Sequence, residues 1–273
     1  MEDPPQADHL RFHFDPRTTL DSFAGQRRRF AAAVERLSLE ELASPSRCAE
    51  WSVADVLRHL VWVDLVLRGI WSGDRSIADG FDPRTTPNDA VRLDRVVPDD
   101  AVRDRYLVST EAMVGELESS GPERFGLPSL SPAGPVPWWM SAVHAGWDSS
   151  IHERDVLAPL GRPVEAGKRE TVPALAYSLV LASFFAGRDL LWVRLGGVEV
   201  RRDGGPVVAR AAADQPGHGD PPVGSPTAVG AVDPVRAVDA IAGRVPVAEA
   251  LEGDAVVVHR LGGLARYFTS VPA

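Results

Sequence analysis

The stretch Cys48–Leu60, which reads CAEWSVADVLRHL, predicts the start of a helix that carries one histidine. Ser52 suits the N-cap of this helix, and Asp55, three residues later, can complete a capping box. Apolar side chains then follow the helical period at Val53, Val56, Leu57, Leu60, Val63 and Leu67. His59 falls at the edge of this apolar stripe and therefore needs a polar partner, which is a backbone carbonyl, a carboxylate or a metal ion.

A second helix, predicted over Trp138–Leu157, offers partners for His59. Its polar stripe contains Ser141, His144, Asp148, His152 and Asp155. Asp148 and His152 are four residues apart, so their side chains leave one face of the helix roughly 5–6 Å apart. With His59 they would form a set of two histidines and one carboxylate, and three protein ligands with an open position are typical of catalytic zinc sites. Such pairs are also common on helices that bind no metal, so a satisfied core histidine is the alternative interpretation.

The motifs Cys48–Leu60 and Asp148–Asp155, the latter an acidic-x-x-x-His-x-x-Asp pattern, resemble the DinB-like metalloenzyme superfamily. Within it they are most similar to the mycothiol-dependent maleylpyruvate isomerase family, and Phe81-Asp82-Pro83 with Asn88 is similar to a loop of that family. One position departs from the pattern, because the family usually has Glu where this chain has Asp148. Aspartate is one methylene shorter, so either the helix lies closer to the metal or the metal shifts.

The resemblance implies a metalloenzyme in which His59, Asp148 and His152 bind a divalent metal of the zinc class. It also implies mycothiol as co-substrate, a low-molecular-weight thiol whose thiolate attacks a small electrophilic molecule. Two reactions share this first step: S-transfer or thiol exchange, and cis–trans isomerisation of maleylpyruvate or a similar cis-alkene acid. The Asp148 departure and the long polar segment at residues 73–100 favour S-transfer, with isomerisation as the alternative. A non-catalytic protein that binds a small molecule or a metal is a further alternative.

Four other polar residues are candidates for the same site. His144 lies one turn before Asp148, and Arg244 ends a late helix; we assign both to catalysis. Arg58 and Arg154 are assigned to cofactor binding, because a guanidinium matches the geometry of a carboxylate. Ion pairs at the protein surface are the alternative use of these two arginines.

Three residues near the ligand positions are expected to support the site rather than to bind the metal or the substrate. Asp155 or Glu153 would orient a metal-bound imidazole. Cys48 has no base near it in the sequence, so we expect it to be a packed structural thiol.

Composition limits the class of protein. The chain has 273 residues and a formal net charge of −9, which argues against a nucleic-acid or anionic-membrane surface. No apolar run reaches the length that spans a membrane, and the start MEDPP lacks the features of a signal peptide, so we expect a cytoplasmic protein. Cys48 is the only cysteine, which excludes an internal disulfide. Arginine supplies almost all basic residues, as in actinobacteria with high-GC genomes, and we expect a monomer or homodimer.

The predicted elements divide the chain into two domains of an α+β fold. Residues 1–165 are expected to form a DinB-like four-helix bundle, with helices near 19–37, 52–67, 99–117 and 138–157. Residues 166–273 are expected to form a small α/β domain, similar to the sterol-carrier-like domain that follows the bundle in the isomerase family. Its predicted elements are a helix at 171–191, a hairpin of 198–202 with 207–211, a strand at 227–232, and helices at 233–242, 247–251 and 261–268.

Three segments are expected to lie outside these regular elements or to be extended. Residues 1–17 are polar and contain proline, which predicts a loosely held lead-in. Residues 73–100 predict a long loop that covers the site. An apolar strand is expected immediately before His259.

Overall fold

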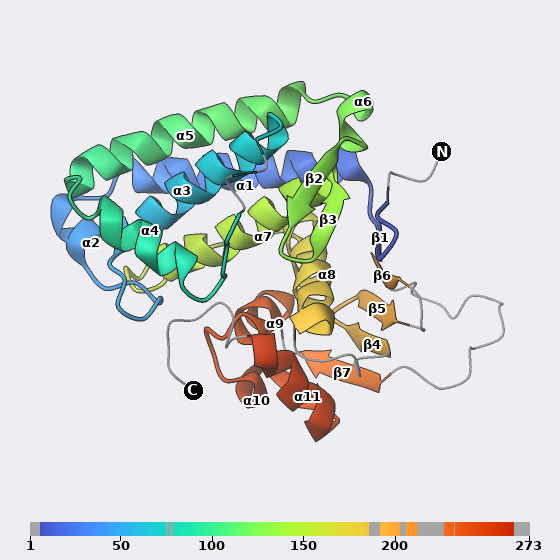
Figure 1. The fold of residues 1–273 in the computed structure, drawn as a ribbon. Helices are drawn as coiled ribbons and strands as arrows, with labels where there is room; N and C mark the ends of the chain where they lie inside the picture. The colour runs from blue at the N-terminus through green and yellow to red at the C-terminus, as the bar shows by residue number, and fades with distance from the viewer. Residues whose placement is uncertain are drawn as a thin grey trace.

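The structure of the chain, a computed structural model, describes residues 6–74, 76, 79–185, 192–202, 206–211, 227–231 and 233–264. A layer of long helices lies beside a smaller unit in which helices pack on a mixed sheet (Figure 1). The fold is therefore α+β, as the sequence predicts.

Four long helices form the larger layer: α1 (Pro16–Val34), α3 (Val53–Trp71), α5 (Asp99–Ser119) and α7 (Trp138–Leu157). Helices α1 and α3 each pack against both α5 and α7. Short helices α2 (Leu39–Ala43) and α6 (Pro122–Phe125) lie in the connections. The ends of all four long helices lie within four residues of the positions that hydrophobic periodicity predicts, because each helix has an apolar face to bury.

Local capping explains where α1 and α3 begin. The Asp15 side chain accepts a hydrogen bond from the backbone N–H of Thr18, and Pro16 occupies the first turn of α1, where its missing N–H costs nothing. The Ser52 side chain accepts from the N–H of Asp55, and the Asp55 carboxylate accepts from the N–H of Ser52. The predicted capping box of α3 is therefore confirmed, and it sets the start of the helix that carries the histidine.

The segment between α3 and α5 is not a continuous loop, because it contains α4 (Thr86–Asp94). Pro87 lies in its first turn, and Val91 is the one buried residue of this helix. A helix with so little apolar face leaves no periodic signal in the sequence, which is why the prediction of a loop at 73–100 was wrong here.

The smaller unit is built on a six-stranded sheet in the order β1-β6-β5-β4-β7-β8. Its strands are β1 (Leu10–His13), β4 (Trp192–Leu195), β5 (Val198–Arg202), β6 (Val207–Ala211), β7 (Thr227–Ala231) and β8 (Leu251–Gly253). The β5–β6 pair is the predicted antiparallel hairpin, with Val198 opposite Ala211. A separate hairpin of β2 (Pro128–Ser131) and β3 (Gly134–Pro137) precedes α7.

The remaining helices are α8 (Lys168–Phe185), α9 (Pro234–Ile241), α10 (Val247–Ala250) and α11 (Ala255–Leu261), and a 3-10 turn spans Gly262–Leu264. The predicted helices at 171–191, 233–242 and 247–251 correspond to α8, α9 and α10, and residues 186–191 lie outside the described part. The strand expected before His259 is wrong. Asp254 accepts hydrogen bonds from the N–H groups of Val256 and Val257 and starts a helix there. Of the helix predicted at 261–268, residues 265–268 lie outside the described part.

Residues 10–13 of the expected lead-in are not loosely held, because they form β1, which pairs in parallel with β6 at the edge of the sheet, and residues 1–5 lie outside the described part. Leu10 and Phe12 point inward and are buried, whereas Arg11 and His13 between them are exposed. Phe12 packs against the rings of Trp139 from α7 and Tyr177 from α8, at centroid distances of 5.8 and 6.4 Å. The amino-terminal strand therefore joins the bundle to the sheet. Whether the two domains divide at 165/166 stays a prediction.

Among the helices that the structure describes, none is long and apolar enough to cross a membrane.

Replacing Phe12 by alanine tests the role of the first strand. We expect Phe12→Ala to lower the free energy of unfolding by about 3–5 kcal/mol, because it removes a buried ring and leaves a cavity. The exposed neighbour Arg11→Ala is the control and should change the free energy by less than about 0.5 kcal/mol. Urea unfolding followed by circular dichroism measures both. Equal, small effects of the two substitutions would show that β1 contributes no packing.

Candidate metal centre

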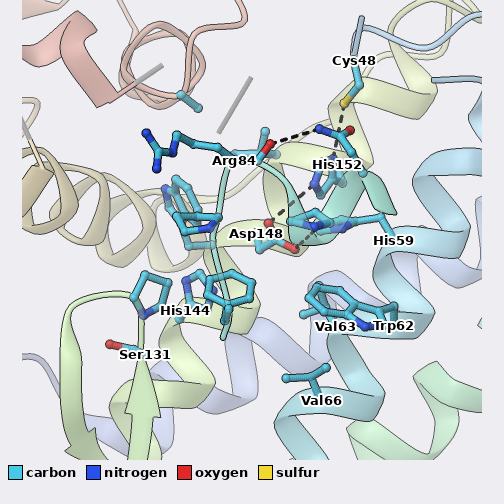
Figure 2. Close-up of a pocket in the computed structure, with 18 of the residues that line it drawn as sticks. Cys48, His59, Trp62, Val63, Val66, Arg84, Ser131, His144, Asp148 and His152 are labelled. Carbon is cyan, nitrogen blue, oxygen red and sulfur yellow. Dashed lines mark hydrogen bonds and ion pairs between the residues drawn. The ribbon is translucent and has the colours of Figure 1, made fainter. Parts of the chain in front are cut away.

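A cavity of about 480 Å³ lies where the bundle meets the C-terminal unit. Its walls come from α3, α7, the β2–β3 hairpin and the turn after α9. The segment between α3 and α5 covers one side, as the sequence predicts, through Phe81, Pro83, Arg84, Pro87 and Asn88. At one end of the cavity, His59, Asp148 and His152 point toward one another (Figure 2).

These three residues lie around one point, although they come from two helices. The Nε2 atom of His59 is 3.4 Å from Oδ2 of Asp148, and Nε2 of His152 is 3.5 Å from Oδ1 of the same carboxylate. The ring centroids of His59 and His152 are 4.8 Å apart. One ligand atom of each residue lies within 4.8 Å of the others. The predicted set of two histidines and one carboxylate is thus brought together in space.

The distances between the ligand atoms of His59, Asp148 and His152 match a zinc-class ion bound between them better than direct hydrogen bonds. The two nitrogen–oxygen distances, 3.4 and 3.5 Å, are long for hydrogen bonds. Tetrahedral zinc with bonds of about 2.0–2.1 Å separates neighbouring ligand atoms by about 3.3 Å, which is close to both distances. Oδ2 of Asp148 is buried and makes no hydrogen bond. The shorter aspartate therefore reaches both imidazoles without moving the helix, and the residues present fit the metal that the resemblance implies.

The negative charge of Asp148 favours a cation between the two imidazoles, and a metal ion there would replace the second proton of His152. Burial would raise the pKa of Asp148, but His152 and His59 lower it well below its ordinary value, so the carboxylate is ionised. Burial would lower the pKa of His152, but Asp148 and Asp155 raise it well above its ordinary value. At His59 burial outweighs the attraction of Asp148, so its pKa is lowered and its imidazole is neutral. An anionic carboxylate and imidazole nitrogens are ligands that zinc-class metals prefer.

Asp155 orients one of these imidazoles, as predicted. Its Oδ2 atom accepts a hydrogen bond from Nδ1 of His152 at 3.0 Å, which leaves Nε2 of that ring facing Asp148. The same carboxylate lies 3.0 Å from Nε of Arg244 and 3.3 Å from Nε of Arg47. Burial would raise the pKa of Asp155, but Arg244 and His152 lower it, so the carboxylate stays charged.

Cys48 lies in this cluster and lines the cavity, which corrects the expectation of a packed structural thiol. Its Sγ atom is 3.1 Å from Oδ2 of Asp155, 3.4 Å from Nη2 of Arg244 and 3.8 Å from Nδ1 of His152. Cys48, His152 and Asp155 also group closely enough to hold an ion. Two guanidinium groups already neutralise Asp155, so a cation is less favoured there than beside Asp148. The sequence alone does not predict this cluster, because Arg244 is far from Cys48 and Asp155 along the chain.

Glu153 is not part of the site. Its carboxylate accepts hydrogen bonds from Gln26 and Arg29 of α1, on the opposite side of α7. Residue 153 is turned by about 100° around the helix from His152, and this turn directs its side chain toward α1.

The two arginines assigned to cofactor binding lie outside the cavity walls that the structure describes. Arg58 is buried and donates to the carboxylates of Asp55 and Asp99 and to two backbone carbonyls. Arg154 is also buried and donates to Asp239 of α9 and to a carbonyl of its own helix. Both assignments therefore lack support, because these guanidinium groups hold elements together. They are buried ion pairs rather than surface ones. Arg47, which the sequence analysis missed, lines the cavity instead.

His144 lies on the cavity wall one turn from Asp148. Its ring packs between Trp147 and Tyr177, at centroid distances of 5.8 and 5.6 Å. The Nδ1 atom is buried and makes no hydrogen bond among the described residues. Burial lowers the pKa of His144 to about 4, so this imidazole is uncharged at neutral pH.

The pKa of His144 predicts a pH dependence of stability. The folded state binds this proton less well than the unfolded state, whose histidine pKa is about 6.5. The stability contributed by neutral His144 is therefore complete above pH 6.5 and is lost as the pH falls toward 4. Between pH 7 and pH 4, the free energy of unfolding of the wild type should fall by up to about 3 kcal/mol more than that of His144→Gln. Urea unfolding of the metal-free proteins measures the difference, and identical pH profiles would contradict it.

Comparison with known proteins gives one family match and two structural matches. The sequence profile of the family described as the mycothiol maleylpyruvate isomerase N-terminal domain matches residues 23–157. No curated protein matches the chain in sequence.

The two solved structures are a crystal structure of the mycothiol-dependent maleylpyruvate isomerase and one of a mutant of it. Both are 12% identical to this chain, with coverage of 88% of this chain and 93% of theirs, and with TM-scores of 0.59 and 0.56. At this identity the structural likeness concerns the fold alone. The matched residues 23–157 hold the histidine of α3 and the aspartate and histidine of α7. Residues 23–157 of this chain, which carry these three side chains, therefore belong to the mycothiol maleylpyruvate isomerase N-terminal domain family, a family that fits the DinB-like superfamily.

Proposed function

We propose that this protein is a mycothiol-dependent metalloenzyme that isomerises maleylpyruvate or a similar cis-alkene acid. One observation carries the proposal: the carboxylate of Asp148 lies between Nε2 of His59 and Nε2 of His152, at the wall of a cavity. Membership of a family named for an isomerase supports the expectation of an enzyme. It also favours isomerisation over S-transfer, the reaction that the sequence analysis preferred.

His59, Asp148 and His152 would hold the metal, and zinc is the ion that suits their chemistry best. When bound, the metal supplies an open position at which the thiol of mycothiol is held as its thiolate at neutral pH. Residues beside the three ligands orient the ligand side chains. Asp155 accepts the Nδ1 proton of His152, so that Nε2 is the nitrogen that would lose its proton and bind the metal.

The reaction begins when the sulfur of the thiolate adds to one alkene carbon. A C–S bond forms, and the electron pair of the double bond moves to the conjugated carbonyl oxygen. The remaining C–C single bond rotates. The electron pair then returns, the C–S bond breaks, and the trans alkene and the thiolate are released. No proton or oxidant is consumed.

Arg244 and His144 have separate roles in this proposal. The guanidinium of Arg244 lines the cavity beside Cys48, where it binds the carboxylate or the developing enolate oxygen of the substrate. Neutral His144 contributes its ring to the cavity wall one turn from Asp148, where it would contact the substrate. Cys48 lies beside the reacting thiol but is not needed as the nucleophile.

S-transfer remains the second candidate, and the observation that favours it is Asp148, the residue at which this chain departs from the family. Both reactions share the addition step. They differ in the product, because S-transfer leaves the thioether and isomerisation returns free mycothiol.

Metal content tests the ligand set. Wild type reconstituted with zinc should contain about one ion per chain, and His59→Ala, Asp148→Ala and His152→Ala should each lose it, because three protein ligands are the minimum for a tight site. His144→Ala is the matched control, since it removes an imidazole from the same wall and should keep the ion. Elemental analysis after dialysis measures the content. An ion retained in all three ligand variants would refute the site.

The role of Arg244 is tested by a charge-conserving change. Arg244→Lys should lower kcat/KM for mycothiol-dependent turnover at least about tenfold, because lysine cannot make the bidentate contact, while metal content stays unchanged. Arg105→Lys is the control, because Arg105 on α5 is exposed, pairs with Asp94 outside the cavity lining and should alter kcat/KM by less than about twofold. Equal effects in both variants would assign Arg244 to structure alone.

A further inference from the structure

The cavity extends well beyond the three metal-site residues, along one face of α3. His59 is followed on this face by a set of apolar side chains that line the cavity: Trp62, Val63, Val66, Leu67 and Ile70. We call the space beside these five residues the apolar arm. In Figure 2, Trp62 and Val63, and then Val66, follow His59 along the helix.

The apolar arm is long enough for more than a small acid. His59 and Ile70 are eleven residues apart, which corresponds to about 16 Å along a helix. Trp147 and Ile151 of α7 face the same cavity. Phe81 stacks on Trp62 with a centroid distance of 6.3 Å and an interplanar angle of 17°, and so extends the aromatic wall. The total volume of about 480 Å³ is in the range that holds a ligand of twenty or more heavy atoms.

Most of the positive charge in the cavity lies at the metal-site end. Among the described residues, the arginines that line it are Arg47, Arg84 and Arg244. Arg47 and Arg244 lie at the metal-site end, beside Asp155. Arg84 comes from the covering segment and pairs with Asp82 at 3.0 Å. A carboxylate placed in the apolar arm would therefore lose its water and meet no arginine other than Arg84, whose charge Asp82 already balances, and this is costly.

We propose that the natural electrophile has an apolar body, an alkyl or aryl group, that lies in the apolar arm. Its conjugated carbonyl and single acidic group lie at the metal-site end, near Arg244. This inference rests on the proposed function and deepens it, because it names the substrate class as an amphipathic cis-alkene acid rather than a compact diacid. The contacts that select this substrate are those of Val66, Trp62 and their neighbours on α3.

Two esters of one acid test the proposal, because they differ only in the apolar group. Monobenzyl maleate should be turned over with mycothiol at a kcat/KM at least about tenfold higher than monomethyl maleate, since the ring is buried in the arm. In Val66→Trp, which fills the arm, this preference should disappear. Val108→Trp is the matched control: Val108 lies on α5 and is 69% exposed, so the preference should be unchanged.

Isothermal titration of each ester into zinc-loaded protein without mycothiol gives a second readout that needs no turnover. Benzyl ester binding at least about tenfold tighter than methyl ester, lost in Val66→Trp, supports the apolar arm even if no isomerisation occurs. In that case the proposed function fails and the inference stands. Mycothiol-dependent turnover of both esters with no benzyl preference, in rate or in affinity, overturns the inference and leaves the function standing. Circular dichroism checks that Val66→Trp is folded, and Val66→Ala, which widens the arm, should keep the benzyl preference.

Discussion

The carboxylate of Asp155 connects three of the parts of the chain that line the cavity. It is fully buried, and it lies within hydrogen-bond or ion-pair distance of His152 on α7, Arg244 after α9 and Arg47 before α3. A buried charge of this kind is stable only when its partners are in place, because desolvation otherwise outweighs the attraction. The position of the imidazole that faces Asp148 therefore depends on docking of the C-terminal unit, and the metal site is complete only in the whole fold.

Helix α7 uses its faces for different purposes, and this separation explains which residues belong to the site. His144, Asp148 and His152 follow a spacing of four residues and face the cavity. Glu153 faces α1, where Arg29 binds it, and Arg154 faces α9. The polar residues of α7 are thus divided between holding neighbouring elements and preparing the cavity. Charge alone does not distinguish the two uses, whereas position around the helix does.

The cavity combines a polar end with an apolar length, and both come from one continuous face of α3. The histidine that faces Asp148 begins this face, and the residues that follow at helical spacing are apolar. In a bundle, this periodicity normally buries the whole apolar face of a helix. Here part of the apolar face of α3 lines the cavity, and the segment that contains α4 forms another wall. A hydrophobic wall beside the candidate metal site also excludes water, which strengthens electrostatic interactions there.

Local chemistry in the sequence was sufficient for the long helices, the capping box of Ser52 and Asp55, and the spacing of Asp148 and His152, because each depends on residues within one or two turns. Tertiary structure alone decided what lies farther apart. It placed β1 in the sheet, brought Arg244 and Arg47 to Asp155, and put Cys48 beside them. It also turned Arg58 and Arg154 away from the cavity. These outcomes depend on which faces of distant elements pack together, and periodicity within one helix carries no information about the partner that an outward-facing charge will find.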